Sequence, residues 1–198
     1  MIATMWTLPN ILTGLRLVAV PVVGTVLVVS GDTEAGRFTA LALFVAASLT
    51  DVADGWVARR RGQCTAFGAL ADPIADKALV ATALVCLSAL ALVPWWATVV
   101  VLAREVVVTG LRLTVLRHGV IPASRGGKMK TATQTALVVL ALAAPEQTEV
   151  LSVAVAVTVL ATVATGVDYG AKAAALGRAE TPALSTVPDA RQRQPAAR

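Results

Sequence analysis

Long apolar runs separated by short polar turns are the feature of this sequence that most restricts its fold. Of its 198 residues, 57% are hydrophobic and only 15% are charged, whereas a soluble domain carries about 25% charged residues. A helix needs about 20 predominantly apolar residues to cross a bilayer, so the chain is long enough for about six spans. We therefore predict an all-α integral membrane protein with six transmembrane helices that form one membrane domain.

The apolar runs and the residues that interrupt them predict where each helix begins and ends. From residue 176 the chain loses apolar periodicity and is rich in polar residues and proline, which is typical of a disordered segment. We therefore predict a membrane domain over residues 1–175 and a disordered cytoplasmic tail over 176–198. The helices are expected at about 9–30, 35–61, 65–93, 95–118, 128–144 and 150–170.

The charged residues of the turns predict the orientation in the membrane. Basic residues gather in the turn at 59–61, in the loop at 117–130 and in the tail, whereas acidic residues and a tryptophan pair mark the turns near Asp32, Trp95 and Glu146. Basic residues in short loops stay on the cytoplasmic side. We expect a multi-pass protein of a bacterial-type inner (plasma) membrane, with both termini and the basic turns in the cytoplasm. No basic stripe with interleaved aromatic residues suggests nucleic acid as a partner.

Four aspartates lie in two pairs within sequence that is otherwise apolar. Asp51 and Asp54 are three residues apart, and Asp72 and Asp76 are four apart, so each pair shares one face of a helix. Carboxylates in a membrane segment are costly and mark a functional site with a cation partner. The basic residues of the same stretch cluster mostly at one turn, which cannot neutralise four acids in place, whereas two divalent ions can.

A site of this composition also indicates a type of chemistry. Oxygen-only ligands favour Mg²⁺ or Mn²⁺ over zinc, and two metal ions held by carboxylates suit displacement at phosphorus. On the first helix, Asn10, Thr13 and Arg16 recur every three residues. Either these residues cap the helix and Arg16 extends to lipid phosphate, or they line a polar cavity shared with the aspartates. Arg104 and Glu105 are candidates for a buried ion pair with other helices.

The aspartates belong to a longer pattern, which resembles the signature of the CDP-alcohol phosphotransferase family. The pattern is Asp51-x2-Asp54-Gly55-x2-Ala58-Arg59-x8-Gly68-x3-Asp72-x3-Asp76, and it matches every fixed position of that signature. The resemblance implies six transmembrane helices, usually in a homodimer, around a polar cavity open to the cytoplasm. It also implies two divalent metal ions, Mg²⁺ or Mn²⁺, on Asp51, Asp54, Asp72 and Asp76, with Asp76 as the base that activates the acceptor hydroxyl. The CDP moiety would lie against Asp51, Asp54, Gly55, Ala58, Arg59 and Gly68.

Four further segments resemble the bacterial phosphatidylglycerophosphate synthases within that family. They are LPNILTGLRLVAVP (8–21), ADPIADK (71–77), REVVVTGLR (104–112) and ASRGGKMKTATQ (123–134). The resemblance implies a phospholipid-biosynthesis enzyme of phosphatidylglycerol synthesis, with CDP-diacylglycerol and sn-glycerol 3-phosphate as substrates among the membrane lipids. It implies direct in-line displacement, giving phosphatidylglycerophosphate and CMP. By charge and position, the residues expected to bind the acceptor phosphate are Arg112, Lys128, Lys130 and, more weakly, Arg125.

Two alternatives differ in how they use the same residues. Another enzyme of this family would use inositol phosphate or, for cardiolipin synthesis, phosphatidylglycerol as the acceptor, and the pair Lys128 and Lys130 favours a phosphorylated acceptor. A cation transporter would use the aspartates as an ion path. Transporters often have inverted repeats and spread their acids along the path, whereas here the acids concentrate at one end of two adjacent helices.

Overall fold

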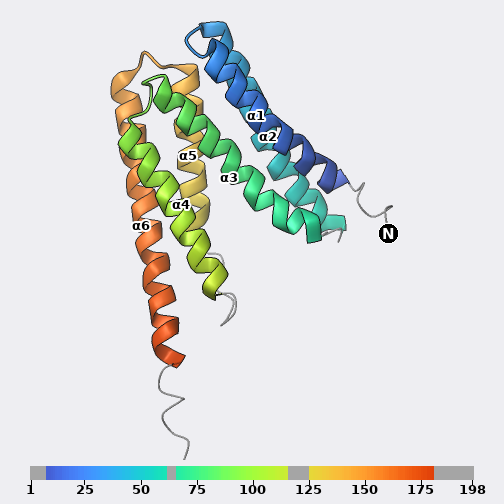
Figure 1. Cartoon of the computed structure of the whole chain (residues 1–198), viewed down its shortest axis with the longest axis vertical. Helices are drawn as coiled ribbons and strands as arrows, with labels where there is room; N and C mark the ends of the chain where they lie inside the picture. Colours follow the sequence, from blue (N-terminus) through green and yellow to red (C-terminus); the bar gives the residue numbers. More distant parts are fainter. Residues whose placement is uncertain (1–7, 62–65, 116–124, 181–198) are drawn as a thin grey trace, which may run out of the picture.

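Six α-helices make up the part of the chain that the computed structural model describes, which is the backbone of residues 8–61, 66–115 and 125–180. Side chains are described for residues 13–50, 74–111, 129–173 and 175. The prediction of an all-helical protein is confirmed. In chain order the helices are α1 (Leu8–Ser30), α2 (Glu34–Arg61), α3 (Ala66–Ala89), α4 (Trp95–Val115), α5 (Arg125–Ala143) and α6 (Thr148–Glu180) (Figure 1).

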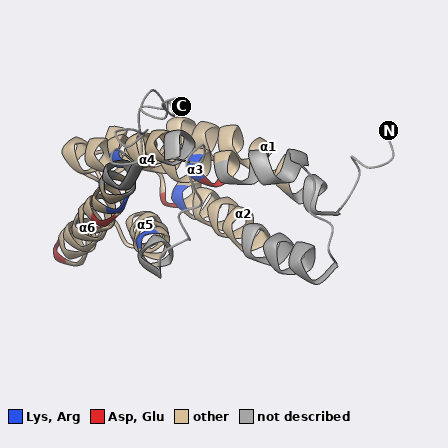
Figure 2. Ribbon diagram, turned by 90° about the horizontal axis from the view of Figure 1, so that it is seen from below, with Lys and Arg blue, Asp and Glu red and all other residues tan. Residues whose placement is uncertain are grey.

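The helix surfaces are those of a membrane protein. Within the described residues, Thr13–Ser30 and Thr148–Ala173 are long and apolar enough to cross a bilayer, and Met129–Ala143 is a shorter apolar helix. Large aliphatic side chains point outward, with Val28 78% exposed and Leu160 69% exposed. Figure 2 shows that charged residues occupy few positions along the described helices. Such apolar outer surfaces match lipid rather than water.

Successive helices run in opposite directions, and α3 is the most central of them. The connections at 31–33, 90–94 and 144–147 lie at one end of the molecule, which is at the top of Figure 1. Helix α3 packs against α1, α2, α4 and α5, while α6 packs against α4 and α5. From the shared end, α1 and α2 diverge from α4 and α6 (Figure 1).

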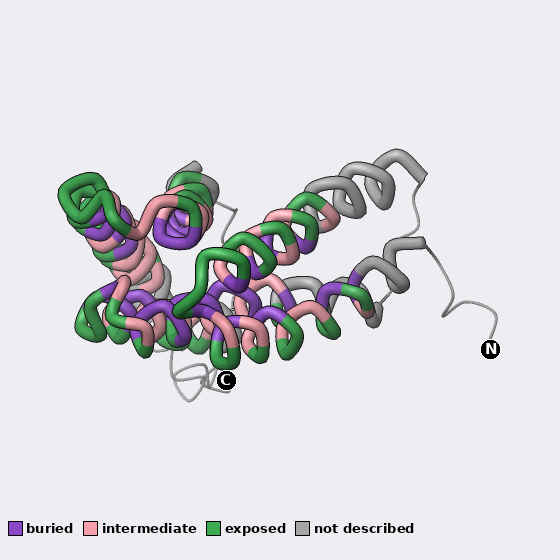
Figure 3. Tube along the Cα trace, turned by 90° about the horizontal axis from the view of Figure 1, so that it is seen from above, coloured by how far each residue is buried: buried purple, intermediate pink, exposed green. Residues whose placement is uncertain are grey.

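Small residues let the helices approach closely in the core. The buried cluster mixes alanines such as Ala40, Ala83 and Ala141 with larger residues such as Phe44. A Cβ atom at Gly24 on α1 would lie 3.0 Å from the Cγ2 atom of Thr82 on α3. In a bilayer, helices associate through close packing rather than by removal from water, so small residues at contacts strengthen association. The buried positions in Figure 3 lie mainly where helices face one another.

Local hydrogen bonds explain where α2 begins. The backbone N–H of Gly36 donates to the Thr33 hydroxyl at 3.1 Å, so Thr33 caps the N-terminus of α2. Glu34 follows in the first turn, where a negative charge interacts favourably with the helix dipole. This start agrees with the predicted one to within a residue.

Helix α3 ends about four residues earlier than the sequence predicted. The backbone N–H of Leu92 donates to the Leu87 carbonyl at 2.9 Å, and Ala91 has a φ of 59°. This is a Schellman motif, in which the left-handed residue is usually glycine. An alanine gives no sequence signal for the motif, so the prediction placed the end at residue 93, next to Pro94.

The ends of α5 and α6 also differ from the predicted ones. Helix α5 begins at Arg125 rather than at about residue 128, and α6 runs to Glu180 rather than to about residue 170. An ion pair between Lys172 and Asp168, one turn apart at 2.6 Å, and good helix formers beyond it extend α6. The helix therefore includes the first residues of the predicted tail, and residues 181–198 lie outside the described residues.

Candidate functional site

The backbones of α2 and α3 carry the two aspartate pairs to matching depths. With a rise of 1.5 Å per residue, Asp54 lies about 10 Å before the end of α2 and Asp72 about 9 Å after the start of α3. Asp51 and Asp76 each lie about 15 Å from the same two ends. Because α2 and α3 contact each other and run in opposite directions, the backbone positions of the two pairs lie at similar levels along the two helices.

The chemistry of this donor set fits divalent magnesium or manganese. Four carboxylates offer only hard oxygen ligands, which these ions prefer. The side chains of Asp51, Asp54 and Asp72 lie outside the described residues, so the metal site stays a prediction. The same holds for the predicted CDP-binding residues Gly55, Ala58, Arg59 and Gly68, whose backbone belongs to α2 and α3.

A small cavity of about 70 Å³ lies between α3, α4 and α5 and includes Asp76. It brings Asp76, the predicted base, together with Lys130, a predicted phosphate ligand, although 54 positions separate them along the chain. Aliphatic side chains of α3 and α4 form the rest of its wall. The polar residues that line the cavity are Asp76, Lys77, Glu105, Lys130, Thr131 and Gln134.

Glu105 of α4 joins cations from three helices at this cavity. Its Oε1 atom accepts a hydrogen bond from the Nζ atom of Lys130 on α5, and its Oε2 atom lies 3.9 Å from the Nζ atom of Lys77 on α3. The neighbouring Arg104 approaches Oε1 at 3.4 Å. These contacts confirm the expectation that Glu105 pairs with other helices. We refer to Glu105, Lys77, Arg104 and Lys130 as the charge cluster.

The charge cluster is largely removed from solvent and carries excess positive charge. The side chains of Glu105 and Lys130 are 15% and 8% exposed, while that of Lys77 is 42% exposed. Three cations approach the Glu105 carboxylate in the cluster, and Asp76 adds a second carboxylate at the cavity. Buried charges are stable only when they are paired and hydrogen-bonded, and the excess positive charge favours an anionic ligand at the cavity.

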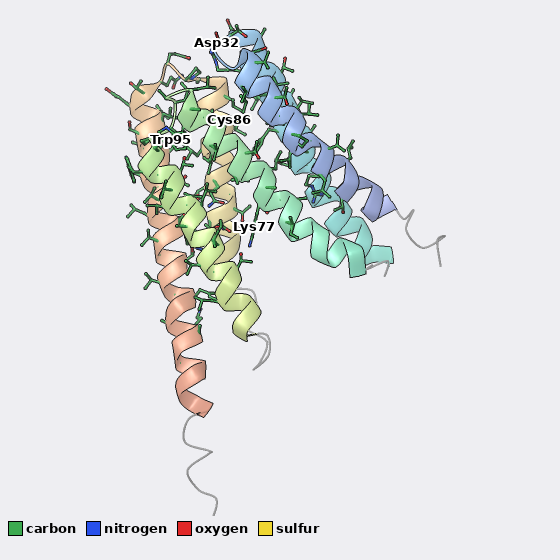
Figure 4. All side chains as sticks on the ribbon, viewed as in Figure 1. Asp32, Lys77, Cys86 and Trp95 are labelled. Carbon is green, nitrogen blue, oxygen red and sulfur yellow. The ribbon has the colours of Figure 1, made fainter. Side chains whose placement is uncertain are left out.

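Lys77 connects α3 to α4 rather than only to its own helix. Its ammonium group donates a hydrogen bond to the Thr109 hydroxyl, and Lys77 lies on the side of α3 toward α4 (Figure 4). Its two partners on α4, Glu105 and Thr109, lie one helical turn apart.

Arg104 fastens α4 to α6. Its Nη2 atom donates to the Thr165 hydroxyl at 3.1 Å, and a Cβ atom at Gly166 would lie 3.2 Å from its Cγ atom. The glycine therefore leaves room for the aliphatic part of Arg104. Arg104 therefore connects the charge cluster on α4 to α6.

The polar residues of α1 point inward. Thr13 is fully buried and Arg16 is 1% exposed, which contradicts the interpretation in which Arg16 extends to lipid phosphate. Arg16 instead lines an otherwise apolar cavity of about 240 Å³ between α1 and α2, which also includes Thr50 next to Asp51. The side chain of Asn10 lies outside the described residues. A role for Asn10, Thr13 and Arg16 beside the aspartates stays a prediction.

The other predicted acceptor residues are placed only by their backbone. Arg112 belongs to the last turn of α4, and Arg125 and Lys128 belong to the first turn of α5. Their side chains lie outside the described residues. Lys130, two residues beyond Lys128, is the predicted acceptor residue whose contacts are described.

Gln134 was not among the residues predicted for the site. It is 4% exposed, lines the cavity, and its Nε2 atom has no hydrogen-bond partner among the described residues. Its spacing of four from Lys130 places both on one face of α5. That spacing is the sequence signal that could have identified Gln134.

Comparisons with known proteins agree with the sequence pattern. A family model described as CDP-alcohol phosphatidyltransferase matches residues 6–166. A protein of Mycobacterium tuberculosis named probable phosphatidylglycerophosphate synthase is 51% identical over 170 residues, which cover 84% of this chain and 81% of that protein. A Bacillus subtilis protein named CDP-diacylglycerol–glycerol-3-phosphate 3-phosphatidyltransferase is 38% identical over 141 residues, which cover 66% of this chain and 73% of that protein.

Proposed function

Because this chain belongs to the CDP-alcohol phosphatidyltransferase family, we propose that it transfers the phosphatidyl group of CDP-diacylglycerol to sn-glycerol 3-phosphate. The products are phosphatidylglycerophosphate and CMP. The relatives from M. tuberculosis and B. subtilis carry names of this activity, and family membership favours an enzyme over a cation transporter. The observation that carries the proposal is the cavity in which Asp76 lies with Lys130.

The proposal includes an orientation in the membrane. In this proposal all six helices span a bacterial-type inner membrane, and the protein forms a homodimer. The aspartates and both termini lie on the cytoplasmic side. The turns at 31–33, 90–94 and 144–147 share one end of the helices (Figure 1). The basic residues near Arg59 and Lys128 belong to helix ends on the other side, as the charge rule for cytoplasmic loops requires.

The reaction follows from the roles of the chain's own residues. Asp76 accepts the proton of the 1-hydroxyl of glycerol 3-phosphate, and the oxygen attacks the β-phosphorus of CDP-diacylglycerol while the bond to CMP breaks. The residues around Asp51, Asp54 and Arg59 hold the CDP moiety. When bound to the four aspartates, two Mg²⁺ or Mn²⁺ ions supply neutralisation of the diphosphate and polarisation of the phosphorus under attack.

Cations of α4 and α5 recognise the phosphate of the acceptor. Lys130 contributes an ammonium group at the cavity, and Arg112, Lys128 and Arg125 extend the positive charge toward the helix ends. An acceptor without a phosphate monoester, such as phosphatidylglycerol, has no need of this many cations. The charge therefore favours a phosphorylated acceptor.

The experiment that tests the function is an acceptor comparison with purified protein in mixed micelles. CDP-diacylglycerol and Mg²⁺ or Mn²⁺ are supplied with glycerol 3-phosphate, inositol 1-phosphate or phosphatidylglycerol, and CMP release is measured. We expect release to depend on glycerol 3-phosphate. We expect Asp76→Asn to lower kcat by about 10²–10⁴-fold, the usual effect of losing a general base.

Asp32→Asn is the matched control, because Asp32 is an exposed aspartate at the far end of the helices. It should leave CMP release unchanged. CMP release with only inositol 1-phosphate or only phosphatidylglycerol would show that the protein has another activity of the family. Normal turnover by Asp76→Asn would remove Asp76 as the base.

A further inference from the structure

Glu105 has a role that its position in the charge cluster suggests and the family signature does not include. We propose that Glu105 is a positioning residue, which holds the ammonium group of Lys130 in the cavity where the phosphorylated acceptor binds. The proposal rests on the proposed function. In it, Glu105 does not touch the acceptor and acts on it through Lys130.

The contacts of Lys130 make such a support necessary. A lysine ammonium is a point charge on a flexible four-carbon chain, so its place in a site depends on what holds it. Lys130 is 8% exposed and donates a hydrogen bond to Glu105. Glu105 comes from a different helix, and that helix is tied to α6 by the bond between Arg104 and Thr165.

The balance of charge leaves room for an anionic ligand. Lys77, Arg104 and Lys130 all approach the same carboxylate. Asp76 lines the same cavity as a second carboxylate, so two carboxylates stand against three cations, and Lys77 is further oriented by the Thr109 hydroxyl. The cluster therefore keeps positive charge for a phosphate while Glu105 prevents the cations from repelling each other out of place.

Gln134 independently indicates that the cavity takes a ligand with oxygen acceptors. Its Nε2 atom is buried with no hydrogen-bond partner among the described residues, and an unsatisfied buried donor is costly. The cavity volume of about 70 Å³ exceeds what one water molecule needs. A compact polar ligand beside Lys130 would accept the hydrogen bond that Gln134 offers.

Two simpler roles for Glu105 predict different results. As a plain counter-charge, Glu105 would weaken phosphate binding, so its removal would lower the KM for the acceptor. As a purely structural ion pair, its removal would lower stability and affect both substrates alike. As a positioning residue, its removal raises the KM for the acceptor selectively.

The test is steady-state kinetics of Glu105→Gln, with each substrate varied separately in mixed micelles. We expect the KM for glycerol 3-phosphate to rise about 10- to 100-fold, as for the loss of a hydrogen bond between charged groups, with the KM for CDP-diacylglycerol unchanged within about twofold. Glu105→Asp, which keeps the carboxylate, should show a smaller rise. The control Glu146→Gln changes an exposed glutamate in the α5–α6 turn and should show none.

A double-mutant cycle checks that Glu105 acts through Lys130. Lys130→Met should raise the acceptor KM, and Glu105→Gln should add little in that background. Independent, additive effects would overturn the proposal, as would a fall in the acceptor KM or equal changes for both substrates.

If Glu105→Gln does not fold, the double variant Glu105→Met with Lys130→Met removes both partners and is tolerated better. A folded double variant with the wild-type acceptor KM would also overturn it.

The outcome for Glu105 can be separated from the outcome for the proposed function. Wild-type protein that releases CMP only with another acceptor would refute the function as stated. The Glu105 variants would then be measured with that acceptor, and a phosphorylated acceptor should show the same selective rise in KM. A selective effect with a phosphate-free acceptor would contradict the role of Lys130 as a phosphate ligand.

Discussion

At the scale of single residues, Ala91 holds a backbone conformation that alanine rarely adopts. Its φ of 59° lies in the left-handed region, which costs a non-glycine residue about 1–2 kcal/mol. Glycine removes this cost, but it also loses about 0.5–1 kcal/mol more conformational entropy on folding. We therefore expect Ala91→Gly to raise the free energy of unfolding by about 0.5–1 kcal/mol, measured as a higher Tm in detergent micelles.

Ala89→Gly is the matched control for Ala91. Ala89 is an exposed residue in the last turn of α3, where glycine is less favourable than alanine by up to about 1 kcal/mol. This variant should lower the Tm. If Ala91→Gly also lowered the Tm, Ala91 would not hold the left-handed conformation at the end of α3.

At the scale of helices, Gly36 permits the tight connection between α1 and α2. A Cβ atom there would lie 1.9 Å from the carbonyl oxygen of Ser30, and a backbone atom cannot move aside as a flexible side chain can. We expect Gly36→Ala to lower the free energy of unfolding by about 1–3 kcal/mol, the usual cost of overpacking. Thermal unfolding in micelles measures it, and the activity per folded molecule should stay normal because the turn lies far from the cavity.

The same glycine-to-alanine exchange at Gly170 should raise the free energy of unfolding rather than lower it. Gly170 lies on α6, and a Cβ atom there has nothing within 4 Å. Alanine is favoured over glycine in a helix by about 1 kcal/mol, so Gly170→Ala should raise the Tm. Equal effects of the two exchanges would mean that the close approach at Gly36 is absent in the protein.

At the scale of the whole molecule, the alternating helices place the acidic turns and the charge cluster at different levels. Asp32 is exposed at one end (Figure 4), and Lys172 is exposed on α6 toward the other end of that helix. In the proposed orientation, a membrane-impermeant maleimide should label Asp32→Cys in intact cells and Lys172→Cys only after the membrane is opened. Both are made in a Cys64→Ser background, where the buried Cys86 should stay unlabelled.

The reversed labelling pattern would place the aspartates on the outer side of the membrane. That result would separate them from cytoplasmic substrates and contradict the proposed function. Labelling of both cysteines in intact cells would indicate that α6 does not cross the membrane as proposed.

The sequence alone determined the number of helices, the spacing of the aspartates and the family. Helix formation and apolar length are local properties, so the six helices were predictable, and so was the placement of both aspartate pairs near the α2–α3 connection. The fixed spacings from Asp51 to Asp76 led to the family, and the family match supports it. The ends at Ala89 and Glu180 were not predictable, because an alanine took the usual place of glycine and a polar segment continued as helix.

Only the tertiary structure decided which side chains meet. Glu105 binds Lys130 and approaches Lys77, and Arg16 turns inward. Both results depend on how each helix is rotated against its neighbours. A helix that is apolar nearly all round carries little periodicity to reveal its inward face, because lipid and protein interior favour the same side chains. The charge cluster is therefore a product of packing between α3, α4 and α5, and no single segment of the sequence contains it.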